Sequence, residues 1–338
     1  MRRRAAERRE HGERVGPASL LRGMPENGAV KRRPSLAAAR ARLAREILQK
    51  VAGPDMDEVR DRIHRTPGPR RFPPDSAIRR VHGDASMYIG GLRALLLQSL
   101  HPLPMAAVAE HSGYRGDPWG RLARTAGFLA STTFGNEEEF DNAIARVRRV
   151  HDFVHGHTPD GVPYTATDPD LLRFVHVAEI DSFLVAHQRY GAERLTPAEY
   201  DAYVAEAATI AMRLGASRAP TTVAELRADL DEFRPAMLGT PAAFSVLRFL
   251  LLSPPVPLVV RPPYALLSAG AIDLLPPWAR RMYRMPELPL AGPLSRPGAH
   301  LVTRVLRNVL AAESIVNADE DDQSAGQIPV VSPVHPGV

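Results

Sequence analysis

The sequence predicts an all-α fold, built as a single multi-helix globular domain. Three segments begin with a capping residue followed by proline at the first helical position, which is a typical helix start: Asp117-Pro118, Asp168-Pro169 and Thr196-Pro197. Apolar residues recur at helical spacing after each start. No segment alternates apolar and polar residues as a strand does, and neither G-x-G-x-x-G nor G-x-x-x-x-G-K-[ST] occurs.

Composition limits the chemistry that the chain can carry. With 338 residues, 44% of them hydrophobic, it is long enough to bury one large core or two medium ones. It contains no cysteine, which excludes disulfides, a thiolate haem ligand, cysteine-ligated iron–sulfur clusters and a cysteine nucleophile. Any metal or haem must therefore be held by His, carboxylate, Tyr or Met.

Charge and proline content divide the chain into four predicted parts. They are a basic leader expected to be disordered (1–34), N-terminal helices (35–66) that include an amphipathic helix at 36–51, the main helical catalytic domain (75–316) and a disordered tail (317–338). Residues 1–80 hold 21 Lys and Arg against 10 Asp and Glu, so the net charge of +5 comes from this end. Such an arm can bind nucleic acid or anionic lipid non-specifically, but its Glu, Gly and Pro content favours a solvated leader.

No membrane span or export signal is predicted. No apolar core of a signal peptide follows the first arginines, and Arg and Pro interrupt the apolar stretch 238–278. A cytoplasmic location is therefore expected. A peripheral contact of 238–278 with a membrane surface is the less favoured alternative to a core or substrate-facing role.

The polar residues of interest lie between Tyr88 and Leu184, where five helices are expected. Their predicted ranges are 90–101, 104–112, 119–134, 137–155 and 170–190. Gly90 and Gly91 let another backbone or a flat ligand approach closely. His151 and His155, spaced i, i+4, would share one face of the fourth helix. With His157 they could bind zinc, although the H-E-x-x-H pattern is absent, and a hydrogen-bonded core histidine is the ordinary alternative.

The order of three short motifs resembles the DUF2236 family, which includes the MpaB-type oxygenases and the rubber-cleaving latex clearing proteins. Arg121-Leu-Ala-Arg124-Thr125 matches R-x-x-[KR]-T, and Val150-His151-Asp-Phe-Val matches V-H-x-x-V. The run from Asp168 to His176 matches D-P-x-L-[LI]-x-x-[VI]-H. The resemblance implies a helical haem b protein that uses dioxygen and holds the haem in a buried pocket.

The resemblance also implies roles for particular residues. His151 would be the axial ligand of the haem iron, and Arg121, Arg124 and Thr125 would line the haem site. The rubber-cleaving members carry lysine at the position of Arg124. A guanidinium stays protonated and cannot ligate iron, so Arg124 would hydrogen-bond oxygen or a propionate, or else form a salt bridge on the helix surface.

Four further residues are candidates. Glu110 is the acid near the arginine motif that could match the base of the rubber-cleaving enzymes, with an ordinary surface position as the alternative. His101 and His111 could each be a hydrogen-bond donor on the distal side or a helix-end residue. His176, with Glu179 one turn on, could support the haem site, be a rival axial ligand, or form a buried pair with no metal.

The sequence therefore predicts a haem b-dependent oxygenase that uses dioxygen on an apolar substrate, such as an isoprenoid or another alkene. One alternative is a non-haem di-iron oxidase, which needs Glu-x-x-His pairs on two helices, whereas only the reversed His176-x-x-Glu179 occurs. A non-catalytic carrier of haem or lipid is the other. A sequence-specific nucleic-acid partner is not expected.

Overall fold

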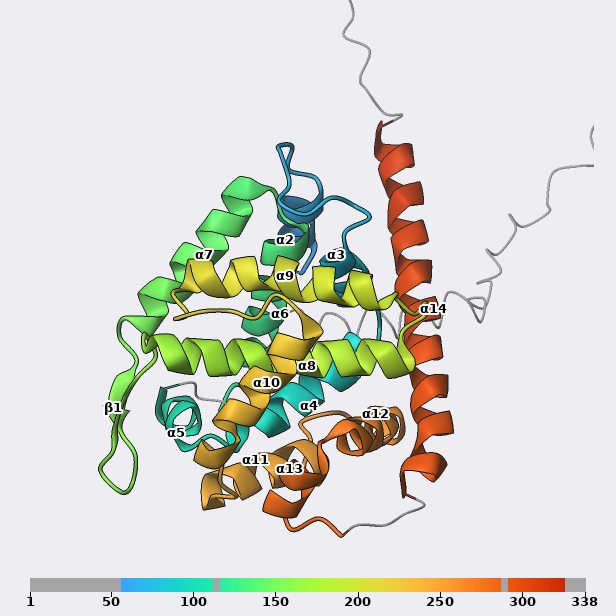
Figure 1. The fold of residues 1–338 in the computed structure, drawn as a ribbon. Coiled ribbons are helices and arrows are strands. Elements are labelled where there is room, and N and C mark those ends of the chain that lie inside the picture. Colours follow the sequence, from blue (N-terminus) through green and yellow to red (C-terminus); the bar gives the residue numbers. More distant parts are fainter. Residues whose placement is uncertain (1–55, 112–115, 287–290, 326–338) are drawn as a thin grey trace, which may run out of the picture. The chain divides into compact units, whose positions relative to one another are not determined.

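The computed structural model describes residues 56–111, 116–286 and 291–325. All of them belong to one unit of the chain, Arg40–Val338; the other unit, Met1–Ala39, lies outside them, as does the predicted helix at 36–51. The described residues confirm the all-α prediction (Figure 1). Their helices and strands are α2 (Met56–His64), α3 (Ala77–His82), α4 (Met87–Ser99), α5 (Pro102–His111), α6 (Pro118–Phe134), α7 (Glu137–His151), β1 (His155–His157), β2 (Pro163–Thr165), α8 (Pro169–Tyr190), α9 (Pro197–Leu214), α10 (Val223–Phe233), α11 (Pro241–Leu251), α12 (Arg261–Leu274), α13 (Pro277–Met282) and α14 (Ala291–Ala325), with short 3-10 turns η1 (Arg234–Ala236) and η2 (Leu258–Val260).

Helix α8 is the centre of the core. α4 packs along it, and α9 and α10 pack against it as well (Figure 1). A Cβ atom on Gly90 of α4 would lie 2.7 Å from Cδ1 of Phe183 on α8, so a larger residue would push the two helices apart. The close approach predicted at this glycine is confirmed.

The predicted helix starts are confirmed by their caps. The Asp168 side chain accepts hydrogen bonds from the backbone N–H groups of Asp170 and Leu171 at the start of α8. Thr196 and Glu199 form a reciprocal capping box at the start of α9. Each cap pairs backbone donors that the first helical turn leaves without partners.

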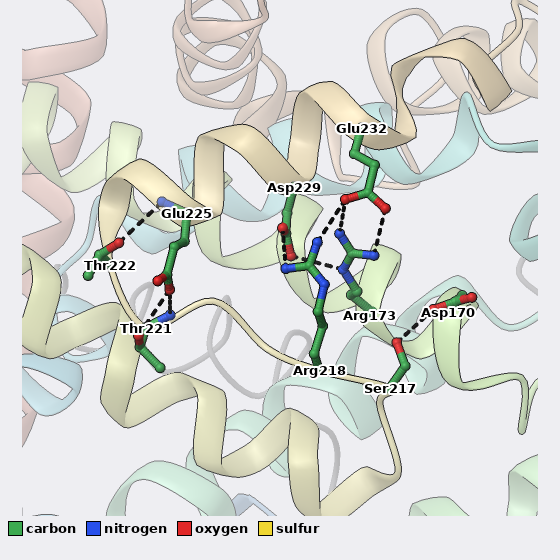
Figure 2. Close-up of polar contacts among 9 residues, drawn as sticks. All are labelled: Asp170, Arg173, Ser217, Arg218, Thr221, Thr222, Glu225, Asp229 and Glu232. Atoms are coloured by element: carbon green, nitrogen blue, oxygen red, sulfur yellow. Dashed lines mark hydrogen bonds and ion pairs between the residues drawn. The ribbon is translucent and has the colours of Figure 1, made fainter.

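A buried ion-pair network joins α8 to α10 (Figure 2). Arg173 donates 2.9 Å to Asp229 and also binds Glu232 through both terminal nitrogens, at 3.0 and 2.5 Å. Arg218 adds a second contact to each acid, at 2.7 Å. The Arg173 and Asp229 side chains are only 5% and 3% exposed, so each charge depends on the other for compensation.

A second apolar cluster holds α12 and α14 against α8. Tyr190, Leu267 and Ala299 are buried together there. α14 continues to Ala325, so the boundary predicted at 316/317 falls inside this helix, while the rest of the tail lies outside the described residues. Among the helices that the structure describes, none combines the length and apolar character needed to cross a bilayer.

The segment after α7 differs from the prediction. The fourth helix was expected to reach His155, but it ends at His151, and His155 begins a two-stranded antiparallel hairpin paired as His155 with Thr165 and His157 with Pro163. The hairpin turn is closed by Thr158, whose side chain and backbone both bond to Val162. The prediction of no strand was therefore wrong at this one place. His151 and His155 do not share a helix face, so the zinc alternative loses its geometric basis.

Candidate active site

Helices α6 and α7 carry two of the sequence motifs. The two helices pack together and are joined by residues 135–136. Next to this connection, Ser131 Oγ donates 2.8 Å to a carboxylate oxygen of Glu139. Arg121 lies in the N-terminal half of α6, and His151 lies on the last turn of α7.

The arginine motif is only partly directed inward. Arg121 is partly buried, and the Thr125 hydroxyl donates 3.1 Å to the Arg121 carbonyl oxygen. The Arg124 side chain is 66% exposed and lies 3.4 Å from Asp117, the cap of its own helix. This contact is the surface salt bridge that was the alternative for Arg124. A role for Arg124 toward a cofactor would require its guanidinium to leave Asp117.

His151 is the last residue of α7, and its imidazole is available to bind a ligand. The side chain is partly buried, and no residue that the structure describes forms a hydrogen bond, ion pair or ring contact with it. Burial lowers the pKa of His151, while Asp152 opposes this shift. The imidazole is therefore neutral near pH 7, which is the form that coordinates a metal ion.

The β-hairpin gathers the end of α5, the end of α7 and the start of α8. Ala166 N donates 2.8 Å to the Val154 carbonyl oxygen, which closes the base of the hairpin. The Tyr164 hydroxyl on β2 donates 2.5 Å to the Glu110 carboxylate at the end of α5. A Cβ atom on Gly156 would lie 2.7 Å from that hydroxyl and 3.0 Å from that carboxylate, so this contact requires glycine. Glu110, the candidate base, is thus held by a phenol.

Tyr164→Phe is expected to lower the free energy of unfolding by about 1 kcal/mol, below the usual range for a hydrogen bond to a charged group, because Glu110 is 58% exposed. Burial, aided by Glu110, raises the pKa of Tyr164 to about 12, so the phenol donates throughout the usual pH range. Urea unfolding measures the loss. In the Glu110→Ala background the same substitution should cost little; an undiminished cost there would mean that the Tyr164 ring packing, and not the hydrogen bond, is responsible.

Four helices contribute polar side chains to a cluster in the core, here called the histidine cluster. Its members are His82 (α3), Thr133 (α6), His176 and Glu179 (α8) and Tyr203 (α9). His82 lies 2.8 Å from the Thr133 hydroxyl and 3.3 Å from the Tyr203 hydroxyl. Burial, together with the neighbouring His176, lowers the pKa of His82 to about 3, and burial lowers the pKa of His176 to about 4. Both imidazoles are neutral, and Nε2 of His176 is buried with no hydrogen-bond partner.

Glu179 is the unusual member of the histidine cluster. Burial raises the pKa of Glu179 to about 7, and no described residue forms a hydrogen bond or ion pair with its carboxyl group. Its side chain is only partly covered although it sits in the middle of the central helix. Buried polar groups are normally paired, so the free Glu179 carboxyl group and the free Nε2 of His176 are both suited to face a bound molecule.

Glu179→Gln is expected to change how stability depends on pH. The folded chain keeps Glu179 protonated up to about pH 7, whereas an unfolded glutamate has its ordinary pKa of 4.5. The folded state therefore binds more protons in this window, and wild-type stability from this group falls as pH rises from about 4.5 to 7, by up to about 3 kcal/mol. The glutamine variant removes that loss. Urea unfolding at both ends of the window should show the variant gaining on the wild type as pH rises; a constant difference would contradict the raised pKa of Glu179.

Half-buried apolar residues on four helices pack against the main core, namely Leu92 and Leu95 (α4), Val108 (α5), Phe128 and Leu129 (α6) and Val175 (α8). A Cβ atom on Gly91 of α4 or on Gly127 of α6 would meet no atom within 4 Å, so neither glycine is required by close packing of its neighbours. Residues of this kind are candidates for lining an apolar ligand.

The remaining histidines have different positions. His101 is buried at the junction of α4 and α5, its ring 4.7 Å from that of Phe174, and its Nδ1 has no hydrogen-bond partner. Burial lowers the pKa of His101 to about 4. His111 lies against Tyr164 at the β-hairpin, with the centres of the two rings 6.2 Å apart. His101 is thus a buried residue between two helices, while His111 packs against the β-hairpin.

A haem needs one imidazole, apolar walls and cations near its carboxylates. His151, half-buried apolar residues and Arg121 are the chain's candidates for these three parts. Within the described residues, no three His, Asp or Glu side chains lie close enough to share one metal ion. A di-iron site would need such a group.

No pattern in the sequence pointed to His82 or Tyr203. Each is an isolated polar residue in an amphipathic helix, and only the packing of α3, α6 and α9 brings their side chains together. Thr133 could be recognised only as a helix residue. Polar residues on an otherwise apolar stripe, as at His176 and Glu179, were the one usable indication.

Comparison with known proteins now bears on these residues. The family model described as ER-bound oxygenase mpaB/B'/Rubber oxygenase, catalytic domain, matches residues 79–311. The match runs from α3 into α14 and includes the arginine motif, His151 and His176. Searches among curated proteins and among solved structures found no match. The matched region covers most of the chain and confirms the resemblance in its sequence: the protein belongs to the family of mpaB and rubber oxygenase catalytic domains.

Proposed function

We propose that this oxygenase-family domain binds one haem b through His151 and uses dioxygen to oxidise an apolar substrate. The observation that carries the proposal is the half-buried imidazole of His151, with which no described residue forms a hydrogen bond, ion pair or ring contact. When bound, haem supplies the one-electron chemistry by which dioxygen reacts with organic molecules. The chain's own residues would position the bound molecules and supply the charged groups of the site.

Each of the other candidates has a proposed task. Arg121, and Arg124 once released from Asp117, would offer positive charge and hydrogen-bond donors to the cofactor's carboxylates or to the oxygen side of the site. Thr125 holds the backbone between them through its bond to the Arg121 carbonyl oxygen. Glu110 would accept a proton from substrate only after the Tyr164 hydroxyl moved away.

We propose an apolar substrate because the chain offers half-buried apolar residues at the edge of its core. The half-buried leucines, valines and phenylalanines offer dispersion contacts and few hydrogen bonds, which favours a hydrocarbon such as an isoprenoid or another alkene. His176, neutral near pH 7, and Glu179, whose pKa burial raises to about 7, would place two weakly polar groups beside it. We propose that oxidative cleavage or oxygenation occurs at a carbon–carbon double bond.

Oxygen uptake tests the activity. The haem-loaded chain should consume dioxygen when an isoprenoid alkene is added, and mass spectrometry should show oxygen from ¹⁸O₂ in the product. Arg121→Gln should slow uptake, by about 10²-fold if the guanidinium acts on developing charge. Uptake that is absent with every alkene tried, together with retained haem, would instead identify a carrier.

A further inference from the structure

We propose that the turn between α11 and α12, residues 252–260, docks on the surface of an anionic lipid bilayer. Leu252 and Leu258 are 75% and 76% exposed on this turn. Single exposed leucines are common on soluble proteins. Two of them on one short turn, separated by Pro254, Pro255 and Pro257, form a small apolar projection, here named the proline turn.

The proline turn is held in place by its own hydrogen bonds. Leu252 N and Ser253 N both donate to the Arg248 carbonyl oxygen, at 2.9 and 3.1 Å, which ends α11. The Tyr264 hydroxyl donates 2.9 Å to the Leu250 carbonyl oxygen and so ties α12 back to α11. Prolines fix their own φ angles and reduce the flexibility of the turn further. The leucines are therefore presented outward by an ordered backbone, and little ordering cost remains for binding.

The charge around the proline turn is positive and uncompensated. Residues 233–272 contain three arginines and no Asp or Glu. Arg248 and Arg261 flank the turn, both are exposed, and neither forms an ion pair or side-chain hydrogen bond with a residue that the structure describes. Some arginines elsewhere on the surface, such as Arg296 and Arg307, are paired with acids. The combination of apolar projection and unpaired cations is complementary to anionic headgroups lying over acyl chains.

A bilayer explains this surface better than a second copy of the chain. Two leucines on a nine-residue turn, 252–260, offer far less than the roughly 800 Å² per partner that a stable protein interface buries. A protein partner would also have to bring acids to Arg248 and Arg261. A bilayer supplies the phosphates and the apolar layer at once and needs no shape complementarity.

Vesicle co-sedimentation of the full chain tests the proposal. Binding is expected to vesicles of phosphatidylcholine mixed with phosphatidylserine and to be weak with phosphatidylcholine alone. Replacing either Arg248 or Arg261 by Gln should weaken binding about fivefold, because one cation near such a surface contributes about a fivefold gain in affinity. Leu252→Ser with Leu258→Ser should weaken it roughly tenfold or more.

The matched control is on α14, where Leu294 and Leu301 are 77% and 59% exposed. Leu294→Ser with Leu301→Ser should bind vesicles as the wild type does. If the double variant Leu252→Ser with Leu258→Ser, here called the proline-turn variant, also binds vesicles as the wild type does, the basic N-terminal region or another surface is responsible and the proposal is wrong. If the proline-turn variant instead loses a dimer seen by sedimentation velocity, while vesicle binding stays unchanged, a second copy covers this turn and the proposal is equally wrong.

A site-specific probe gives an independent measurement. The chain has no cysteine, so Leu258→Cys and Leu294→Cys each place one environment-sensitive fluorophore at a known position. On adding phosphatidylserine-containing vesicles, the emission at position 258 should shift to the blue while that at 294 stays unchanged. An equal response at both positions, or none at 258, would overturn the proposed docking.

Discussion

We expect His151→Ala to lose most of the haem that the wild-type chain binds. The imidazole is the proposed protein ligand of the iron, and no described residue forms a hydrogen bond, ion pair or ring contact with it. Loss of groups that merely support a metal ligand already costs about 10–100-fold in affinity, so loss of the ligand itself should cost more than about tenfold. The ratio of the Soret absorbance to the protein absorbance after gel filtration measures the effect.

Two histidine variants show whether the effect is specific. His155 is exposed on β1, so His155→Ala should keep its haem although it lies only four positions further along the chain. His176→Ala tests the rival ligand, because Nε2 of His176 is buried and unpaired. Haem lost from His176→Ala but kept by His151→Ala would transfer the iron ligand to α8. The family membership of the chain would then still hold, but the proposed iron site would be wrong.

Arg173→Met is expected to destabilise the fold by about 3–5 kcal/mol, because it leaves the buried carboxylate of Asp229 without its main partner. Glu232 first, and then Asp229, raise the pKa of Arg173, which shows how strongly the two acids hold the charged guanidinium. The network also fixes α10 against α8 (Figure 2), and α8 carries His176 and Glu179. Guanidinium chloride unfolding followed by circular dichroism measures the loss.

Arg218→Met is the matched control in the same network. Arg218 contacts the same two acids, but its side chain is 52% exposed, so its loss should cost less than about 1 kcal/mol. Equal losses in the two variants would show that burial does not decide the strength of these ion pairs. The interpretation of Arg173 as a structural residue would then need to be abandoned.

Helix positions could be predicted from the sequence because their determinants are local. Asp168 and Thr196 cap the helices that their sequence context indicates, and Gly90 marks a close helix contact. The hairpin after His151 could not be predicted in this way. Val154 and His155 continue the helical spacing, and the competing structure depends on a contact between Tyr164 and Glu110, which are 54 positions apart.

The candidate site was predictable to the extent that its residues lie in motifs. His151 and Arg121 were identified by their motifs, and the structure places His151 on the last turn of α7 and Arg121 in the first half of α6, both partly buried. The surface position of Arg124 depends on whether Asp117 or an interior group attracts its charge, which spacing alone does not decide. His82 and Tyr203 required tertiary packing, since their partners come from other helices.

The haem and iron content of the purified wild-type chain tests the central claim most directly. The account predicts one haem b and one iron per chain, measured by the pyridine haemochrome spectrum and by elemental analysis after haem reconstitution and gel filtration. Two irons per chain without porphyrin, or a chain that retains no haem, would contradict it.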